Sequence, residues 1–132
     1  MLRRDFERLV AQALDALPAW VGERMDNLGI RVEERPSKAL CKDMGIPYAE
    51  GLLGLYEGPS LLERDPAVMS GPSRVVLYQR MIESEARHEA DLPRVVLETL
   101  AHEIGHYFGM TDDEIEAFEA EWERRRRTPH SP

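Results

Sequence analysis

Hydrophobic positions follow a helical spacing near the start of the chain. Between residues 4 and 17, apolar side chains recur at intervals of three and four residues, at Phe6, Leu9, Val10, Ala13, Leu14 and Leu17. This spacing predicts an amphipathic helix with one buried stripe, which Pro18 ends. A second short helical stretch is expected over residues 20–27.

The middle of the chain is typical of short strands separated by turns. Residues 30–33 alternate between apolar and polar side chains, which predicts a half-buried strand. Residues 52–56 and 74–80 are predicted to be two further strands, and the second carries the strongest strand signal in the chain. The segment from 36 to 48 gives mixed signals around a turn at Gly45 and Pro47, and Leu61–Ser73 is predicted to be a loop.

Two helices are predicted at the C-terminal end. The first runs from about Leu92 to Phe108, with Asp91 as its N-cap, Pro93 in its first turn and Gly109 after its last turn. The second begins at Thr111, because Thr111 and Glu114 have the spacing of a capping box. Helices and strands together indicate an α+β fold, and neither a linker nor an internal repeat divides residues 1–132 into more than one domain.

Composition and charge narrow the class of protein. With 132 residues and 42% hydrophobic positions, the chain is long enough and apolar enough for one globular domain. The net charge of −8 argues against a general nucleic-acid binder. The basic run Arg124–Arg127 is the exception, and stabilisation of a helix C-terminus explains it better than nucleic-acid binding does.

Other features of the sequence set expectations about location and partners. No segment has the length and apolarity of a membrane helix or of a secretory signal, so we expect a cytoplasmic protein. The single cysteine, Cys41, excludes an intramolecular disulfide, and we expect it to be a small buried or half-buried side chain. We expect a monomer that binds neither nucleic acid nor a membrane.

The predicted helix over residues 92–108 contains the sequence His102-Glu103-Ile104-Gly105-His106. Two histidines four residues apart lie on one helix face, so both imidazoles can reach a single metal ion. Zinc suits such neutral imidazole ligands. Glu103 lies beside them and can take a proton from a zinc-bound water and later pass it to a leaving amine.

The helical wheel places these histidines away from the core. Leu97, Leu100, Ala101, Ile104 and Phe108 form the apolar stripe, and the two histidines point about 160° away from it. They are therefore not satisfied core histidines, and the remaining alternative is an ordinary pair of surface histidines.

A zinc ion at a hydrolytic site needs a third protein ligand. Gly109 lets the chain reverse, and Asp112, six residues after His106, can then turn its carboxylate toward the ion. The alternative is that Asp112 only stabilises the first turn of the next helix through the helix dipole. Asp113 is the second candidate for the third ligand, and Glu116 is a further one.

The pattern His102-Glu103-x-x-His106-x-x-Gly109-x-x-Asp112 resembles the minimal zincin-like metallopeptidase domains of bacteria. Gly54–Gly58, Arg74–Tyr78 and the N-terminal helix also resemble that family. The resemblance implies a small mixed sheet with helices packed against it, in which an active-site helix is followed by a C-terminal helix. It further implies that His102, His106 and Asp112 bind zinc and that Glu103 is the catalytic carboxylate.

The sequence leaves two functions open. One is a zinc-dependent peptidase in which a zinc-bound water, activated by Glu103, attacks a peptide carbonyl; the other is a zinc-binding interaction module without turnover.

A peptide or protein substrate is expected to add to an edge strand, for which Val75–Tyr78 is the candidate. The group that stabilises the oxyanion is left open among Tyr107, Tyr56, Tyr78, His88 and Arg80, with a slight preference for Tyr107.

Overall fold

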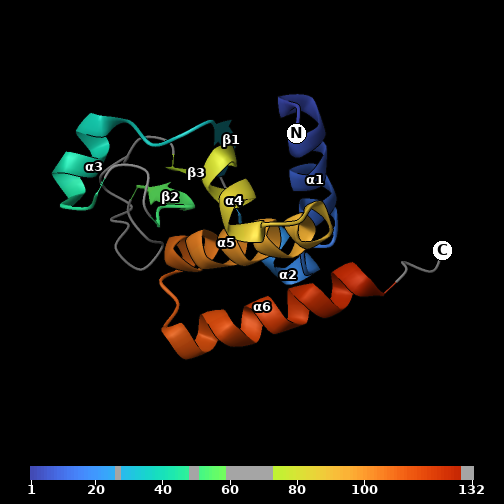
Figure 1. Cartoon of the computed structure of the whole chain (residues 1–132). Coiled ribbons are helices and arrows are strands. Elements are labelled where there is room, and N and C mark those ends of the chain that lie inside the picture. The colour runs from blue at the N-terminus through green and yellow to red at the C-terminus, as the bar shows by residue number, and fades with distance from the viewer. Residues whose placement is uncertain (26–27, 48–50, 59–72, 129–132) are drawn as a thin grey trace.

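The structure is a computed structural model that describes residues 1–25, 28–47, 51–58 and 73–128 (Figure 1). Within these ranges, helices and strands follow one another along the chain in a mixed order. They are α1 (Arg3–Asp15), α2 (Ala19–Gly22), β1 (Leu28–Glu33), α3 (Lys38–Met44), β2 (Gly54–Glu57), β3 (Ser73–Tyr78), α4 (Gln79–Ala86), a 3-10 turn (Glu89–Asp91), α5 (Leu92–Phe108) and α6 (Asp112–Arg127). The α+β class predicted from the sequence is confirmed.

The three strands form one mixed sheet in the order β1-β3-β2. Strand β1 runs parallel to β3, and β2 runs antiparallel to β3 on its other side. Because β3 pairs with a neighbour on each side, Val75–Tyr78 is not an edge strand, and the prediction that made it one is wrong. The edge strand that packs on α5 most extensively is β2.

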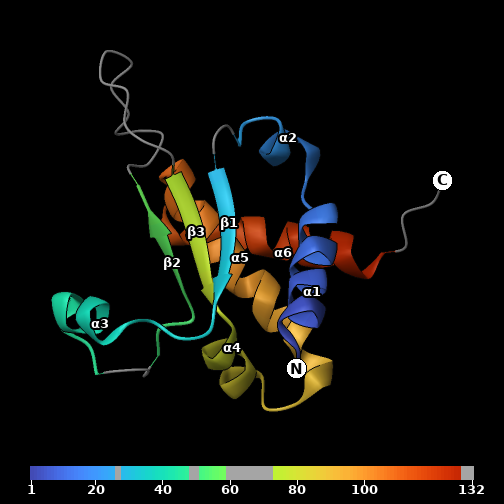
Figure 2. The same ribbon diagram turned by 90° about the horizontal axis from the view of Figure 1, so that it is seen from above.

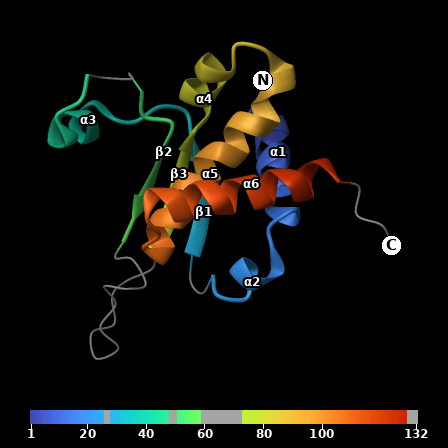
Figure 3. The same ribbon diagram turned by 90° about the horizontal axis from the view of Figure 1, so that it is seen from below.

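Helix α5 lies between the sheet and α6 (Figure 1). Seen from above, the three strands lie over α5, and α1 stands beside β1 (Figure 2). Seen from below, α6 crosses α5 on the side away from the sheet (Figure 3). The apolar stripe of α5 is therefore buried, and it joins the side chains of α1, β3, α4 and α6 in one hydrophobic core.

The two C-terminal helices have the bounds that their start and stop signals predict. Helix α5 ends at Phe108, and Gly109 takes the left-handed conformation with φ of 72°. Thr111 and Glu114 form the predicted capping box at the start of α6. Asp91 precedes α5 as predicted, but its side chain makes no capping hydrogen bond, because the 3-10 turn already leads the backbone into the helix.

Two helices were not predicted. Helix α3 lies in the segment of mixed signals, where the Ser37 hydroxyl accepts a hydrogen bond from the Leu40 amide and Gly45 ends the helix. Helix α4 starts at Gln79, directly after β3, so the predicted strand over residues 74–80 is two residues too long. Most of the predicted loop Leu61–Ser73 lies outside the described residues, and Ser73 itself begins β3.

Several smaller predictions can be compared with the structure. Cys41 is buried, as expected. The run Arg124–Arg127 forms the last turn of α6, where the helix dipole favours cations. In the described part of the chain, no helix combines the length and the apolar composition that crossing a membrane requires.

Candidate metal centre

The two histidines of α5 lie together on its exposed face. Leu97, Leu100 and Ile104 have no solvent exposure, whereas His102 and His106 are both exposed. Their ring centroids are 5.2 Å apart. The prediction that the pair points away from the core is confirmed, and two imidazoles so placed on adjacent turns can bind one ion.

Glu103 is more buried than its place in the helix predicts. Its side chain is only 11% exposed, because β2 packs over it. The Tyr56 amide of β2 donates a hydrogen bond of 2.8 Å to Oε1 of Glu103. Nδ1 of His106 lies 3.5 Å from the same oxygen. The carboxylate is thus held at the boundary between the protein interior and the exposed histidine face.

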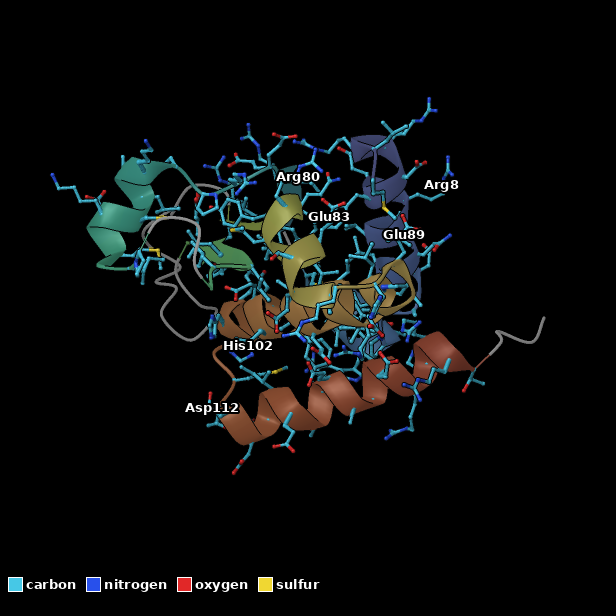
Figure 4. The ribbon with its side chains drawn as sticks, in the orientation of Figure 1. Arg8, Arg80, Glu83, Glu89, His102 and Asp112 are labelled. Carbon is cyan, nitrogen blue, oxygen red and sulfur yellow. The ribbon has the colours of Figure 1, made fainter. Side chains whose placement is uncertain are left out.

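Asp112 is the first residue of α6 and is exposed. Figure 4 shows Asp112 and His102 at the same end of the molecule, on consecutive helices. Nevertheless, no three His, Cys, Asp or Glu side chains among the described residues lie close enough together to hold a metal ion. The structure therefore brings His102 and His106 together but does not complete the set with Asp112, Asp113 or Glu116, and the third ligand stays a prediction.

Two glycines, one in the last turns of α5 and one after it, shape the junction between α5 and α6. Gly109 reverses the chain, and its amide donates to the His106 carbonyl while the Met110 amide donates to the Gly105 carbonyl. At Gly105 the helices approach so closely that a Cβ atom there would lie 2.5 Å from Cγ1 of Ile115. The sequence did not single out Gly105, yet its lack of a side chain lets Ile115 of α6 pack directly against α5 between the two histidines.

A cavity of about 390 Å³ opens beside His102 and Glu103. The acidic side chains Glu85, Glu98 and Glu119 also line it, and there is no lysine or arginine among the described residues that line it. Burial raises the pKa of the Glu119 carboxyl, and the nearby Glu98 raises it further, whereas His102 lowers it. Sequence reasoning missed these residues, although Glu98 stands four residues before His102 and therefore lies on the same helix face.

None of the five candidates for stabilising the oxyanion lines this cavity. Tyr107 is fully buried and its ring contacts that of Tyr56 edge to face, so the preference for it is not supported and packing explains it. Tyr78 is also buried, which raises its pKa to about 12. Arg80 forms ion pairs with Glu34 and Glu83. Exposed His88 lies in the turn after α4.

Zinc fits the donor types that α5 and α6 present. The two neighbouring exposed imidazoles, and the exposed Asp112 carboxylate at the start of α6, are nitrogen and oxygen donors of the types that catalytic zinc sites use. Glu103 is held beside His106 by the Tyr56 amide. The chemistry of these donors is therefore compatible with zinc.

Comparison with known proteins identifies a family for the chain. A search of curated proteins found no match to the chain. The family model of the zincin-like metallopeptidases matches residues 25–122, which include the sheet, α5 with its two histidines, and α6 as far as Trp122. The match begins after α1, and it covers well over half of the sequence. The chain therefore belongs to the zincin-like metallopeptidase family.

Proposed function

We propose that the protein is a zinc-dependent peptidase in which His102, His106 and Asp112 hold the metal and Glu103 is the catalytic carboxylate. The observation that carries the proposal is the placement of Glu103. Its carboxylate is almost fully buried and fixed by the Tyr56 amide, directly beside two exposed histidines. A module that only bound metal would not need a carboxylate held in this way.

Zinc at these ligands supplies Lewis-acid polarisation of the scissile carbonyl and acidifies a water molecule. The Glu103 carboxylate accepts a proton from the attacking water as the water oxygen bonds to the carbonyl carbon. When the C–N bond breaks, Glu103 passes that proton to the leaving amine nitrogen. One carboxylate thus serves first as general base and then as general acid.

A peptide substrate is proposed to lie along β2 rather than along β3. Strand β2 is the edge of the sheet that packs on α5, and the cavity beside His102 and Glu103 is lined by its Gly54 and by the preceding residues 51–53. An extended peptide can add to such an edge through main-chain hydrogen bonds. This position brings the scissile bond beside Glu103.

The alternative function is a zinc-binding interaction module without turnover. The observation that favours it is that the described residues do not gather three ligands into a complete metal site. In that case the face of His102 and His106 would present metal to a partner, and Glu103 would be only a structural acceptor for the Tyr56 amide.

Metal content decides whether the site exists. Purified protein is loaded with zinc, dialysed and analysed by mass spectrometry beside His106→Ala and Asp112→Ala. One zinc per chain in the wild type, its loss in His106→Ala and much weaker retention in Asp112→Ala are expected. Equal retention in Asp112→Ala would exclude Asp112 as a ligand, and the measurement would then be repeated with Asp113→Ala and Glu116→Ala.

Cleavage decides between the two functions. A broad peptide library is incubated with the zinc-loaded wild type and with Glu103→Gln. The peptidase predicts zinc-dependent cleavage by the wild type and none by Glu103→Gln, although both bind zinc equally. Cleavage by both proteins at one rate would refute the role of Glu103, and no zinc-dependent cleavage by the wild type would favour the interaction module.

A further inference from the structure

We infer that the main-chain amide of Tyr56 is a positioning group that fixes the orientation of the Glu103 carboxylate, and that Gly54 is required for this contact. The inference rests on the proposed function, since it concerns how the catalytic carboxylate is held. It assigns a role to two residues of β2 that lie far from the His-Glu-x-x-His sequence of α5.

The register of the sheet shows why this amide is available. The Tyr78 amide donates to the Leu53 carbonyl, and β2 is antiparallel to β3. Because hydrogen-bonded residues alternate along an antiparallel strand, Leu53 and Leu55 direct their main-chain groups toward β3, and Tyr56 directs its own away from it. The Tyr56 amide therefore serves no strand pairing, and it donates to Glu103 instead, at 2.8 Å.

Gly54 lets β2 approach α5 closely enough for this hydrogen bond. A Cβ atom on Gly54 would lie 2.8 Å from Cγ2 of Thr99 and 3.1 Å from the Val76 carbonyl oxygen. The Thr99 methyl cannot easily turn aside, because the Thr99 hydroxyl donates to the Val95 carbonyl at 2.8 Å and so fixes the rotamer. A side chain at position 54 would force β2 and α5 apart.

The hydrogen bond between Tyr56 and Glu103 is one of three contacts that one face of α5 makes with β2. Thr99 meets Gly54, Glu103 meets the Tyr56 amide, and the Tyr107 ring contacts the Tyr56 ring with centroids 5.8 Å apart. These residues of α5 are spaced four apart, so they share one helix face. That face is turned toward β2, next to the face that presents His102 and His106. The contacts of Thr99 and Tyr107 hold β2 against α5 on both sides of Glu103 along the helix.

Fixing one oxygen of a carboxylate leaves the other for chemistry. A carboxylate has two oxygens with four acceptor positions, and a hydrogen bond to a charged acceptor is about twice as strong as a neutral one. With Oε1 held by the rigid strand, Oε2 can be directed at the attacking water. Loss of the donor would let the Glu103 side chain sample other rotamers, which lowers kcat without changing the metal ligands.

Two pairs of variants measure the effect on catalysis. Tyr56→Pro removes the amide but keeps the pairing with β3, since its N–H does not point at β3. Tyr56→Ala, which keeps the amide and loses the ring, is its matched control. We expect kcat to be about tenfold lower or more in Tyr56→Pro than in Tyr56→Ala, with similar KM and zinc content. Equal kcat values would overturn the inference.

The second pair tests Gly54 by rescue. Gly54→Ala is expected to lower kcat by a comparable factor, and Gly54→Ala with Thr99→Ser is expected to recover much of it, because serine lacks the methyl group that the new Cβ meets. No recovery in the double variant would exclude a clash with Thr99 as the cause.

The closing experiment needs neither zinc nor substrate. Amide hydrogen exchange at Tyr56 is measured by NMR in the full-length wild type, Glu103→Gln and Glu103→Ala, with the Leu55 amide, which faces β3, as internal reference. Protection of Tyr56 is expected in the wild type, retained in part in Glu103→Gln, which keeps an acceptor oxygen, and lost in Glu103→Ala while Leu55 stays protected. Equal exchange at Tyr56 in all three proteins would overturn the inference. A wild type that cleaves no peptide would instead refute the proposed function. The exchange measurement would still test the hydrogen bond between the Tyr56 amide and Glu103.

Discussion

Gly105 occupies a place in α5 where helix propensity alone would favour almost any other residue. Glycine in a helix interior costs up to about 1 kcal/mol relative to alanine. The structure supplies the compensation, because Ile115 of α6 packs directly over Gly105, with Cγ1 and Cδ1 at 2.5 Å and 2.9 Å from a Cβ built there. Glycine at this position, between the two histidines, therefore allows α5 and α6 to pack closely together.

Gly105→Ala is predicted to destabilise the fold. Overpacking costs about 1–3 kcal/mol, which exceeds the gain in helix propensity. Chemical denaturation of the wild type, Gly105→Ala, Ile115→Ala and the double variant measures it. Because Ile115→Ala removes the atoms that the new Cβ meets, the double variant should be less destabilised than the sum of the single variants. If the losses in the free energy of unfolding of the two single variants simply added in the double variant, the new Cβ would not clash with Ile115, and the helices would have moved apart without strain.

At the scale of the element, the capping box of α6 gives a second prediction. The Thr111 hydroxyl accepts from the Glu114 amide, and the Glu114 carboxylate accepts from the Thr111 amide. Thr111→Ala should lower the free energy of unfolding by about 1 kcal/mol, within a range of about 0.5–2, whereas Thr111→Ser should change it little. Equal losses in both variants would show that the hydroxyl cap is not the cause.

The same capping box makes part of the stability depend on pH. The hydrogen bond from the Thr111 backbone lowers the pKa of the Glu114 carboxyl below its ordinary value. A lowered pKa means that the contribution is present above the ordinary value and is lost as the pH falls through the lowered one. Unfolding of the wild type and Glu114→Gln is therefore expected to differ most at neutral pH and to converge in acid. A difference that stays constant from neutral pH into acid would contradict the assignment.

Elements with local start and stop signals were predictable, and those without them were not. Pro93 and Gly109 define the ends of α5, and Thr111 defines the start of α6, so the sequence predicted both helices correctly. Helix α4 follows β3 with no capping hydrogen bond at Tyr78, and the apolar residues before it extended the predicted strand to Arg80. The central place of β3 depends on pairings between distant segments, which local patterns do not encode.

The same distinction applies to the candidate site. The exposure of His102 and His106 follows from the periodicity of α5 alone, and the sequence predicted it. The burial of Glu103 does not, because a helical wheel treats the helix in isolation and β2 comes from residues about fifty positions earlier. Whether Asp112 can bind the same ion as the two histidines depends on where the turn at Gly109 places α6. Asp112 as the third ligand therefore stays a prediction.

At the scale of the whole molecule, charge predicts a preference among substrates. The chain carries a net charge of −8, and Glu85, Glu98 and Glu119 line the cavity beside His102 and Glu103, where the structure describes no basic lining residue. Such a field attracts cations and raises their rate of association. We therefore expect a larger kcat/KM for a peptide with lysine or arginine near the scissile bond than for a neutral peptide of equal length.

Ionic strength tests whether the preference is electrostatic. The Debye length falls from about 30 Å at 0.01 M to about 3 Å at 1 M salt, so the ratio of the two kcat/KM values should decrease toward one over this range. Glu119→Gln, which removes a carboxylate from the cavity, should lower the ratio at low salt. Glu23→Gln, which removes an exposed carboxylate that does not line the cavity, should lower it less. A ratio of the two kcat/KM values that does not change with salt would assign the preference to the shape of the cavity. A higher kcat/KM for the neutral peptide would refute the predicted preference for basic peptides.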